Sequence, residues 1–124
     1  MSYFIEATRN TPKISFDTEN GTFEISGRSM PENTRKFYDP VISWIREYNP
    51  EEGKSMSLTL NLTYLNTSST IAMLEILKTF AKFKESNNPL KVFWYYEQYD
   101  EDMKLAGEDI ASISELEFEY IMEE

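Results

Sequence analysis

Four consecutive hydroxyl side chains are the feature of this sequence that most directly suggests chemistry. They stand between an alternating stretch, residues 57–65, and an amphipathic stretch, residues 71–85, and they are Thr67, Ser68, Ser69 and Thr70. A hydroxyl group at the point where a strand passes into a helix can cap that helix. It can also accept a phosphoryl group from a kinase, which adds about −1.5 to −2 charges and three strong acceptor oxygens.

Both interpretations fit the position of the hydroxyl run. Asn66, Thr67 and Ser68 suit an N-cap, because each can accept a hydrogen bond from an unpaired backbone N–H, worth about 1 kcal/mol. Capping requires one or two such residues, whereas the polar run extends from Asn66 to Thr70. A helix N-terminus also attracts a phosphate through its free N–H groups and its dipole. Thr67 is the best candidate acceptor, because it is the first hydroxyl residue after the strand and is expected to point outward.

The absence of two residue types excludes several classes of enzyme. The chain contains no cysteine and no histidine, which excludes thiolate nucleophiles, Ser-His-Asp relays and the usual zinc ligand sets. Neither an EF-hand spacing nor a glycine-rich phosphate loop is present. A small hydrolase or transferase that uses paired carboxylates is an alternative, but no feature places two acids across a cleft. We therefore expect no enzymatic activity, no cofactor and no metal site.

The length and hydrophobicity of the chain predict its class and its cellular location. The sequence has 124 residues, of which 40% are hydrophobic, and this suggests a single domain over residues 1–124. No apolar run is long enough to span a membrane, and the N-terminal residues lack the pattern of a signal peptide. We therefore expect a cytoplasmic protein without a membrane partner.

The negative charge of the chain is confined to its C-terminal part. Residues 1–96 hold 11 acidic and 11 basic residues, whereas residues 97–124 hold 11 acids and a single base, Lys104, so the net charge of −10 arises there. This sign disfavours nucleic acid as a partner. The acidic block either keeps an edge strand soluble or steers a basic partner by its field.

Alternating apolar residues predict the strands. A hairpin is expected around Asn20-Gly21, since an Asn-Gly pair can adopt the positive φ angles of a tight turn. A weaker strand precedes it, and three later strands follow, the last of which alternates with acids as an edge strand does. In the order of the chain, the predicted strands cover residues 3–8, 13–17, 22–26, 57–65, 90–98 and 115–124.

Helical spacing predicts three helices between the later strands. In the first, over residues 29–48, Ser29 and Glu32 have the spacing of a capping box, and Pro40 is expected to kink the helix or to restart it with Asp39 as the cap. Asp100 is the expected cap of a short acidic helix over residues 101–111. The expected apolar faces are Phe37, Val41, Trp44 and Tyr48 in the first helix, and Ile71, Leu74, Leu77 and Phe80 or Ala81 in the second.

The order of these elements predicts an α/β fold. Sequential strands joined by helical crossovers imply right-handed βαβ units in a mixed sheet. Each helix has one apolar face, so the helices should pack mainly on one face of that sheet. In the aromatic strand, Phe93 and Tyr95 alternate with Val92, Trp94 and Tyr96. If one of these sets faces solvent, the strand provides an apolar patch, and the chain is then a passive ligand-binding or protein-binding module.

Three stretches of the sequence resemble the SiaC family of regulatory phosphoproteins, which is related to the STAS-domain antagonists of anti-sigma factors. They are TRNTPKISFD, GRSMPENTRKFYDPVISWIREY and LTYLNTSSTIAMLEIL. The resemblance extends to about Glu97 and implies a STAS-like mixed sheet. It also implies a partner switch in signal transduction, in which a dedicated serine/threonine protein kinase modifies the strand–helix junction and a PP2C-type phosphatase reverses the modification.

The resemblance also implies a partner and a set of site residues. The unmodified form binds and activates a GGDEF-type diguanylate cyclase, which links the chain to cyclic-di-GMP signalling and biofilm regulation. The phosphoacceptor falls on Thr67, and Asn66, Ser68 and Ser69 support the encounter with kinase or phosphatase. Antagonists of anti-sigma factors usually carry Asp-Ser-Ser-Gly at this junction, so the sequence favours the cyclase-linked branch, with an anti-sigma factor antagonist as the alternative.

The motif SMPEN is a second candidate for partner recognition. Glu32 and Asn33 either belong to the cap of the first helix or lie at the same sheet edge as Thr67, because both helices start where parallel strands end. In the second case their polar groups are available to a partner. The two interpretations stay open at the level of sequence.

Overall fold

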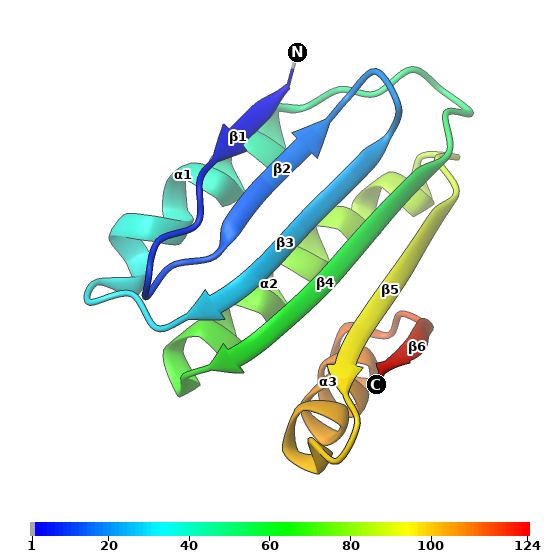
Figure 1. The fold of residues 1–124 in the computed structure, drawn as a ribbon. Helices are drawn as coiled ribbons and strands as arrows, with labels where there is room; N and C mark the ends of the chain where they lie inside the picture. Colours follow the sequence, from blue (N-terminus) through cyan, green and yellow to red (C-terminus); the bar gives the residue numbers. More distant parts are fainter. Residues whose placement is uncertain (1) are drawn as a thin grey trace.

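A computed structural model describes residues 2–124 as a six-stranded sheet with three helices (Figure 1). The strands are β1 (Tyr3–Ile5), β2 (Lys13–Asp17), β3 (Thr22–Ser29), β4 (Met56–Leu65), β5 (Leu90–Glu97) and β6 (Phe118–Glu123). The helices are α1 (Thr34–Glu47), α2 (Thr67–Glu85) and α3 (Glu101–Ser114).

The sheet is mixed, and its strands follow one another in space as they do in sequence. The order is β1-β2-β3-β4-β5-β6. The first three strands pair antiparallel, and β3 to β6 pair parallel through the crossover helices. All three helices cover the same face of the sheet (Figure 1). The predicted α/β fold, a mixed sheet with helices mainly on one face, is confirmed.

Parallel pairing brings the ends of three strands and the starts of three helices to one edge. The strands β3, β4 and β5 end there, and α1, α2 and α3 begin there (Figure 1). We call it the carboxyl edge. The backbone N–H of Asn66 donates to the carbonyl of Ser29 over 3.1 Å, which ties the end of β4 to the end of β3. Ligand and partner sites of parallel sheets concentrate at such an edge.

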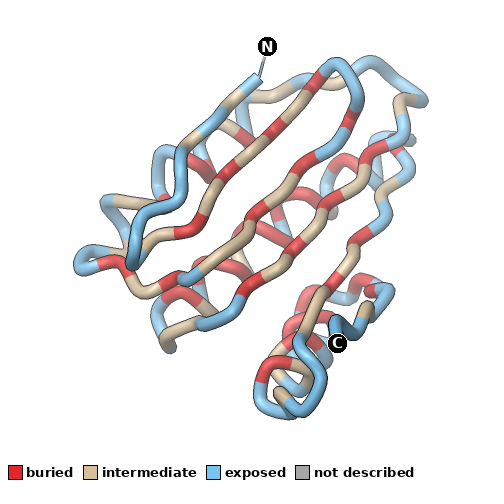
Figure 2. The backbone as a smooth tube through the Cα atoms, viewed as in Figure 1, coloured by how far each residue is buried: buried red, intermediate tan, exposed pale blue. Residues whose placement is uncertain are grey.

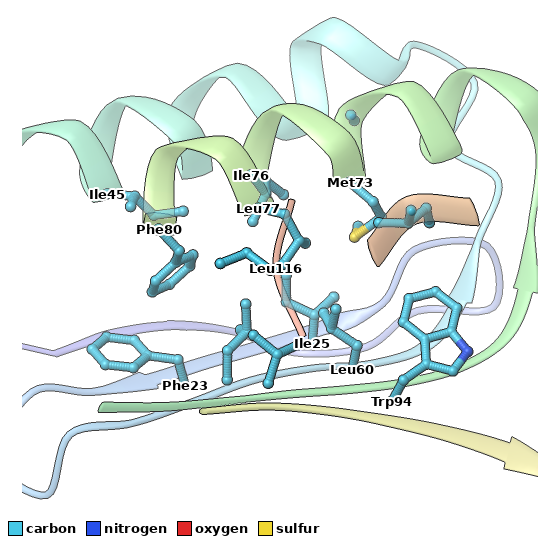
Figure 3. Packing of buried hydrophobic residues seen from close by; sticks show 14 of the residues in the cluster. Phe23, Ile25, Ile45, Leu60, Met73, Ile76, Leu77, Phe80, Trp94 and Leu116 are labelled. Atoms are coloured by element: carbon cyan, nitrogen blue, oxygen red, sulfur yellow. The ribbon is translucent and has the colours of Figure 1, made fainter. Parts of the chain in front are cut away.

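The core lies between the sheet and α1 and α2. Leu58, Leu60 and Leu62 of β4 are buried, and buried positions occur along both the sheet and the helices behind it (Figure 2). In the close view, Leu60 lies on the side of the sheet that faces Met73 and Ile76 of α2 (Figure 3). The apolar face predicted for α2 is partly wrong, since Ile71 is 59% exposed. The buried side of this helix comprises Ser69, Ala72, Met73, Ile76, Leu77, Thr79, Phe80 and Phe83. The helix is therefore rotated about its own axis relative to the prediction, and two polar residues, Ser69 and Thr79, lie on its buried side.

The start of α1 also differs from the prediction. Its N-cap is Asn33, whose side-chain oxygen accepts from the backbone N–H of Lys36 over 3.1 Å. The capping box between Ser29 and Glu32 is therefore wrong, because Ser29 belongs to β3 and is fully buried.

The helix α1 also continues through its proline. It runs unbroken from Thr34 to Glu47 with Pro40 inside it. The predicted restart with Asp39 as a cap is therefore wrong. Asp39 instead forms an ion pair one helical turn away, with Arg35. Other local predictions are confirmed: the β2–β3 hairpin encloses Asn20-Gly21, although only Gly21 has a positive φ.

A helical glycine allows α3 to lie close to the sheet. Gly107 is buried against the indole of Trp94, and a Cβ at this position would lie 2.5 Å from the indole nitrogen. The same nitrogen donates to the carbonyl of Met103 over 3.0 Å. The indole is thus held between strand β5 and helix α3, and there is no space for a methyl group between them.

We predict that Gly107→Ala destabilises the protein by about 1–3 kcal/mol, the usual effect of overpacking a core. Helix propensity alone would stabilise this variant by about 1 kcal/mol, so the sign of the change decides which effect dominates. Urea unfolding measures it. Leu105→Ala on the exposed side of α3 is the control, with an expected change within about 0.5 kcal/mol. An increase in stability for Gly107→Ala would contradict the packing argument.

Candidate functional site

The hydroxyl run lies at the carboxyl edge, where β4 passes into α2. Asn66 is the N-cap of α2, and its side-chain oxygen accepts from the backbone N–H of Ser69 over 2.9 Å. One polar residue therefore satisfies the capping requirement, as the sequence allowed. The four hydroxyl residues that follow are left for other roles, and the structure gives them different environments.

Ser69 is fully buried and belongs to a chain of three hydroxyl groups. Ser29 donates to Ser69 over 2.8 Å, and the hydroxyl of Tyr38 lies 2.5 Å from the Ser29 oxygen. All three residues have 0% exposure. The chain joins β3, α1 and α2 beneath the carboxyl edge. Ser69 therefore positions α2, and its side chain has no surface for the partner contact that we expected of it.

Ser68 and Thr70 have partners close to the helix start. The Ser68 hydroxyl lies 2.6 Å from the hydroxyl of Thr34, the first residue of α1. Thr70 donates its hydroxyl to the carbonyl of Asn66 over 3.2 Å. Ser68 is exposed, so its hydrogen bond connects the starts of α1 and α2 at the surface.

Thr67 differs from its three neighbours. It is the first residue of α2 and is exposed. Within residues 2–124, its hydroxyl forms no hydrogen bond. The first backbone N–H groups of a helix have no acceptor within the helix, so a phosphate on Thr67 would lie beside free donors. The structure thus leaves one hydroxyl of the run both exposed and unbonded, at the residue that the sequence favoured.

The rotation of α2 that buries Ser69 also exposes an apolar residue beside Thr67. Residues four apart lie on the same side of a helix, so Ile71 lies one turn beyond Thr67. Its side chain is 59% exposed. The two residues form a small mixed surface on α2, an unbonded hydroxyl followed by an exposed branched side chain.

Ion pairs fix the relative position of α1 and α2 next to this surface. Glu75 of α2 pairs with both Arg35 and Arg46 of α1, each over 3.1 Å. Arg35 also pairs with Asp39, and the hydrogen bond with Glu75 contributes most to raising the pKa of its guanidinium. Both arginines of α1 therefore already have carboxylate partners.

Two hollows open near the junction. One, of about 450 Å³, is lined by Glu32 and Asn33 together with Thr11, Pro31, Lys36 and Phe37. The other, of about 270 Å³, lies between Thr70, the end of β4 and the start of α3, and it contains Asp100 and Asp102. Glu32 and Asn33 are exposed at the same edge as Thr67, although Asn33 also serves as the cap of α1.

Comparison with known proteins identifies the family to which the chain belongs. A model of the SiaC family, described as regulatory phosphoproteins, matches residues 5–123. This chain belongs to the SiaC family. The match spans all the elements that build the junction, so the resemblance read from three stretches is confirmed for nearly the whole length.

Relatives of this SiaC-family chain come from Pseudomonas aeruginosa. An uncharacterized protein of strain UCBPP-PA14 is 31% identical over 105 residues, which cover 85% of this chain and 83% of the relative. The structure of apo-SiaC is 27% identical with a TM-score of 0.83, covering 100% of this chain and 99% of SiaC. SiaC in complex with diguanylate cyclase SiaD, whose activator it is, is 28% identical with a TM-score of 0.87, covering 98% and 99%.

Several roles at this SiaC-family site were not predicted from the sequence. Ser29 was assigned to a helix cap and Ile71 to the core. In the structure, Ser29 and Tyr38 hold Ser69, and Thr34 holds Ser68. No pattern within one element reveals these contacts, because they join residues up to 40 positions apart. No cluster of three or more possible metal ligands occurs within residues 2–124, and none of their helices has the length and apolar character needed to cross a membrane.

Burial of the hydroxyl chain predicts a pH dependence of stability. Burial raises the pKa of Tyr38 to about 12 from an ordinary value of 10. A group whose pKa is raised by folding stabilises the protein below its unfolded pKa, and that contribution is lost as the pH rises toward the folded value. Stability should therefore fall between pH 10 and pH 12, by at most about 1.4 kcal/mol per pH unit for this group.

We predict that Tyr38→Phe flattens this loss. At neutral pH the variant should be less stable by about 1 kcal/mol, because one buried hydrogen bond is removed. Denaturant unfolding of wild type and variant across pH 7–11.5 measures both effects. Tyr99→Phe, at an exposed tyrosine, should keep the wild-type slope. An identical alkaline slope for Tyr38→Phe and wild type would contradict the assignment.

Proposed function

We propose that this chain is a phosphorylation-controlled binding protein, whose unmodified form binds and activates a GGDEF-type diguanylate cyclase. The observation that carries the proposal is the exposed, unbonded hydroxyl of Thr67 at the first position of α2. The family of regulatory phosphoproteins and the complex of the relative SiaC with diguanylate cyclase SiaD support it. In this proposal a serine/threonine protein kinase modifies Thr67, and a PP2C-type phosphatase restores the free hydroxyl.

A comparison of free energies indicates that a phosphate on Thr67 blocks association with the partner and leaves the fold unchanged. The helix N-terminus stabilises a negative group by about 0.3–1 kcal/mol. A partner that covers a phosphate removes its hydration, at a penalty of several kcal/mol unless new partners compensate. Arg35 and Arg46 are already paired, and Asp100 and Asp102 lie in the adjoining hollow. Neither arginine of α1 is free to compensate the added charge, so the complex weakens while the fold persists.

Ile71 provides the apolar part of the proposed interface. Binding energy concentrates in a few side chains that become fully covered, surrounded by polar contacts. Ile71 is one turn from Thr67, and Asn66 and Ser68 lie on either side of the threonine. The hollow with Glu32 and Asn33 lies at the same edge. A partner that covers Ile71 would also cover Thr67, so a phosphate on Thr67 would lie within the interface.

We predict that phosphothreonine incorporated at position 67 weakens binding to a GGDEF cyclase by at least tenfold and abolishes its activation. The physical reason is the buried, uncompensated charge. Isothermal titration and a cyclic-di-GMP synthesis assay measure the two effects. Thr67→Ala should bind like wild type and resist the kinase. Thr67→Asp should have a smaller effect than phosphothreonine, because aspartate carries about half the charge.

Two controls separate the site from the mechanism. Ser68→Ala should still be modified at position 67, as peptide mass spectrometry shows directly. Circular dichroism of the phosphorylated protein should match that of the unmodified protein. Phosphate found on another residue would overturn the choice of Thr67. Undiminished cyclase binding by the phosphothreonine protein would overturn the charge block.

We predict that Ile71→Ala weakens cyclase binding about fivefold to thirtyfold, the range for a central interface residue. Its matched control is Ile113→Ala, since Ile113 is 56% exposed on α3 and lies at the other end of its helix. Both variants should keep wild-type stability within about 0.5 kcal/mol. Equal affinities for the two variants would remove Ile71 from the interface.

A further inference from the structure

Strand β6 forms one side of the sheet, and its outer edge is open. Its six residues pair parallel with β5, from Val92 opposite Phe118 to Glu97 opposite Glu123. It is the last strand in the sheet order, and within residues 2–124 no strand pairs with its other side (Figure 1). An open strand edge can accept a further strand through its backbone groups.

The backbone groups that face this open edge can be identified. The carbonyl of Glu123 accepts from the N–H of Gln98 on the β5 side, over 2.7 Å. In a strand, the N–H and C=O of one residue point to the same side, and successive residues point to opposite sides. The groups of Glu123, Ile121 and Glu119 therefore face β5. Those of Tyr120 and Met122 face outward and are free to pair.

The side chains of β6 make this edge selective. Glu119 and Glu123 are exposed and lie on the face of the sheet that no helix covers. On the opposite face, Tyr120 and Met122 remain 39% and 48% exposed. A strand that paired here would bring one set of side chains beside carboxylates and the other beside partly exposed apolar groups.

Glu123 is the acid of this edge with the least compensation within residues 2–124, whereas Glu119 shares a hollow with Lys84 and Lys91 without forming an ion pair. Glu97 lies directly opposite Glu123, a cross-strand pair of like charges that is unfavourable. Lys104, the single base in residues 97–124, has its amine over the ring of Tyr96 at 6.0 Å. None of the ion pairs found within residues 2–124 involves residues 97–124. An incoming cation would therefore relieve a repulsion that the fold leaves in place.

We propose that β6 binds an extended segment of a partner protein in which lysine or arginine alternates with apolar residues. The cations lie beside Glu119 and Glu123, and the apolar residues contact Tyr120 and Met122. A second copy of this chain is disfavoured as the occupant, because two β6 strands would bring carboxylates together. The acids thus disfavour self-association through β6 and favour pairing with a basic strand. This surface is separate from Thr67 and does not depend on the proposed cyclase.

The test uses the full chain and a capped eight-residue peptide of alternating lysine and valine. Amide hydrogen exchange followed by NMR should show new protection at Tyr120 and Met122, with little change at Glu119 and Glu123, whose amides already face β5. The same peptide with N-methylated amides keeps its charge but cannot pair, so it should leave exchange unchanged. Protection at every second residue therefore distinguishes strand pairing from diffuse charge attraction, which would not follow the alternation of the backbone groups.

Charge variants test the selectivity. Glu119→Gln with Glu123→Gln should weaken peptide binding about tenfold and lower its salt dependence. Glu47→Gln with Glu52→Gln, at exposed acids outside β6, should bind like wild type. Equal binding by both double variants, or protection without alternation, would overturn the proposal. Concentration-dependent dimers of the free chain in sedimentation, with protection at Tyr120 and Met122, would overturn it in favour of a second copy.

Discussion

The burial of one serine hydroxyl determines how the carboxyl edge is arranged. Ser69 has no exposure, and a buried hydroxyl without a partner costs about 1–3 kcal/mol. Ser29 and Tyr38 remove that cost, so the three residues form a unit that joins β3, α1 and α2. Once this side of α2 is fixed inward, a residue two positions earlier points to solvent. The exposure of Thr67 is therefore a consequence of the core, and the loop does not have to be strained to present it.

The same arrangement separates modification from folding. A phosphate on Ser69 would have to enter a closed hydroxyl chain and would break the contact between three elements. A phosphate on Thr67 would lie in solvent beside the first free N–H groups of α2. In the proposed switch, this hydroxyl changes charge while the hydrogen bonds of Asn66, Ser68 and Thr70 stay in place.

Signals contained within one element were sufficient to predict most of the fold. Alternation gave the strands, including the acidic edge strand, and Asp100 was recognised as the cap of α3. The side of α2 that faces the core was missed, because the spacing of Ile71, Leu74 and Leu77 is as regular as that of the residues that are buried. Only the long-range hydrogen bond between Ser29 and Ser69 shows which of the two sides of α2 is buried. The capping box at Ser29 failed for the same reason, since that serine is held by Tyr38.

The two proposed surfaces have different electrostatic surroundings. The first 96 residues are neutral overall, but Asp100 and Asp102 of the acidic block line the hollow beside Thr70, so a phosphate at Thr67 would add negative charge near two acids. Strand β5 lies between β4 and β6, so β4, from which α2 begins, is two strand separations, about 10 Å, away from β6 within the sheet. That distance is about one Debye length at physiological salt. Salt therefore weakens, without removing, the interaction between charges at the two surfaces, and a basic strand can occupy β6 whether or not Thr67 carries a phosphate.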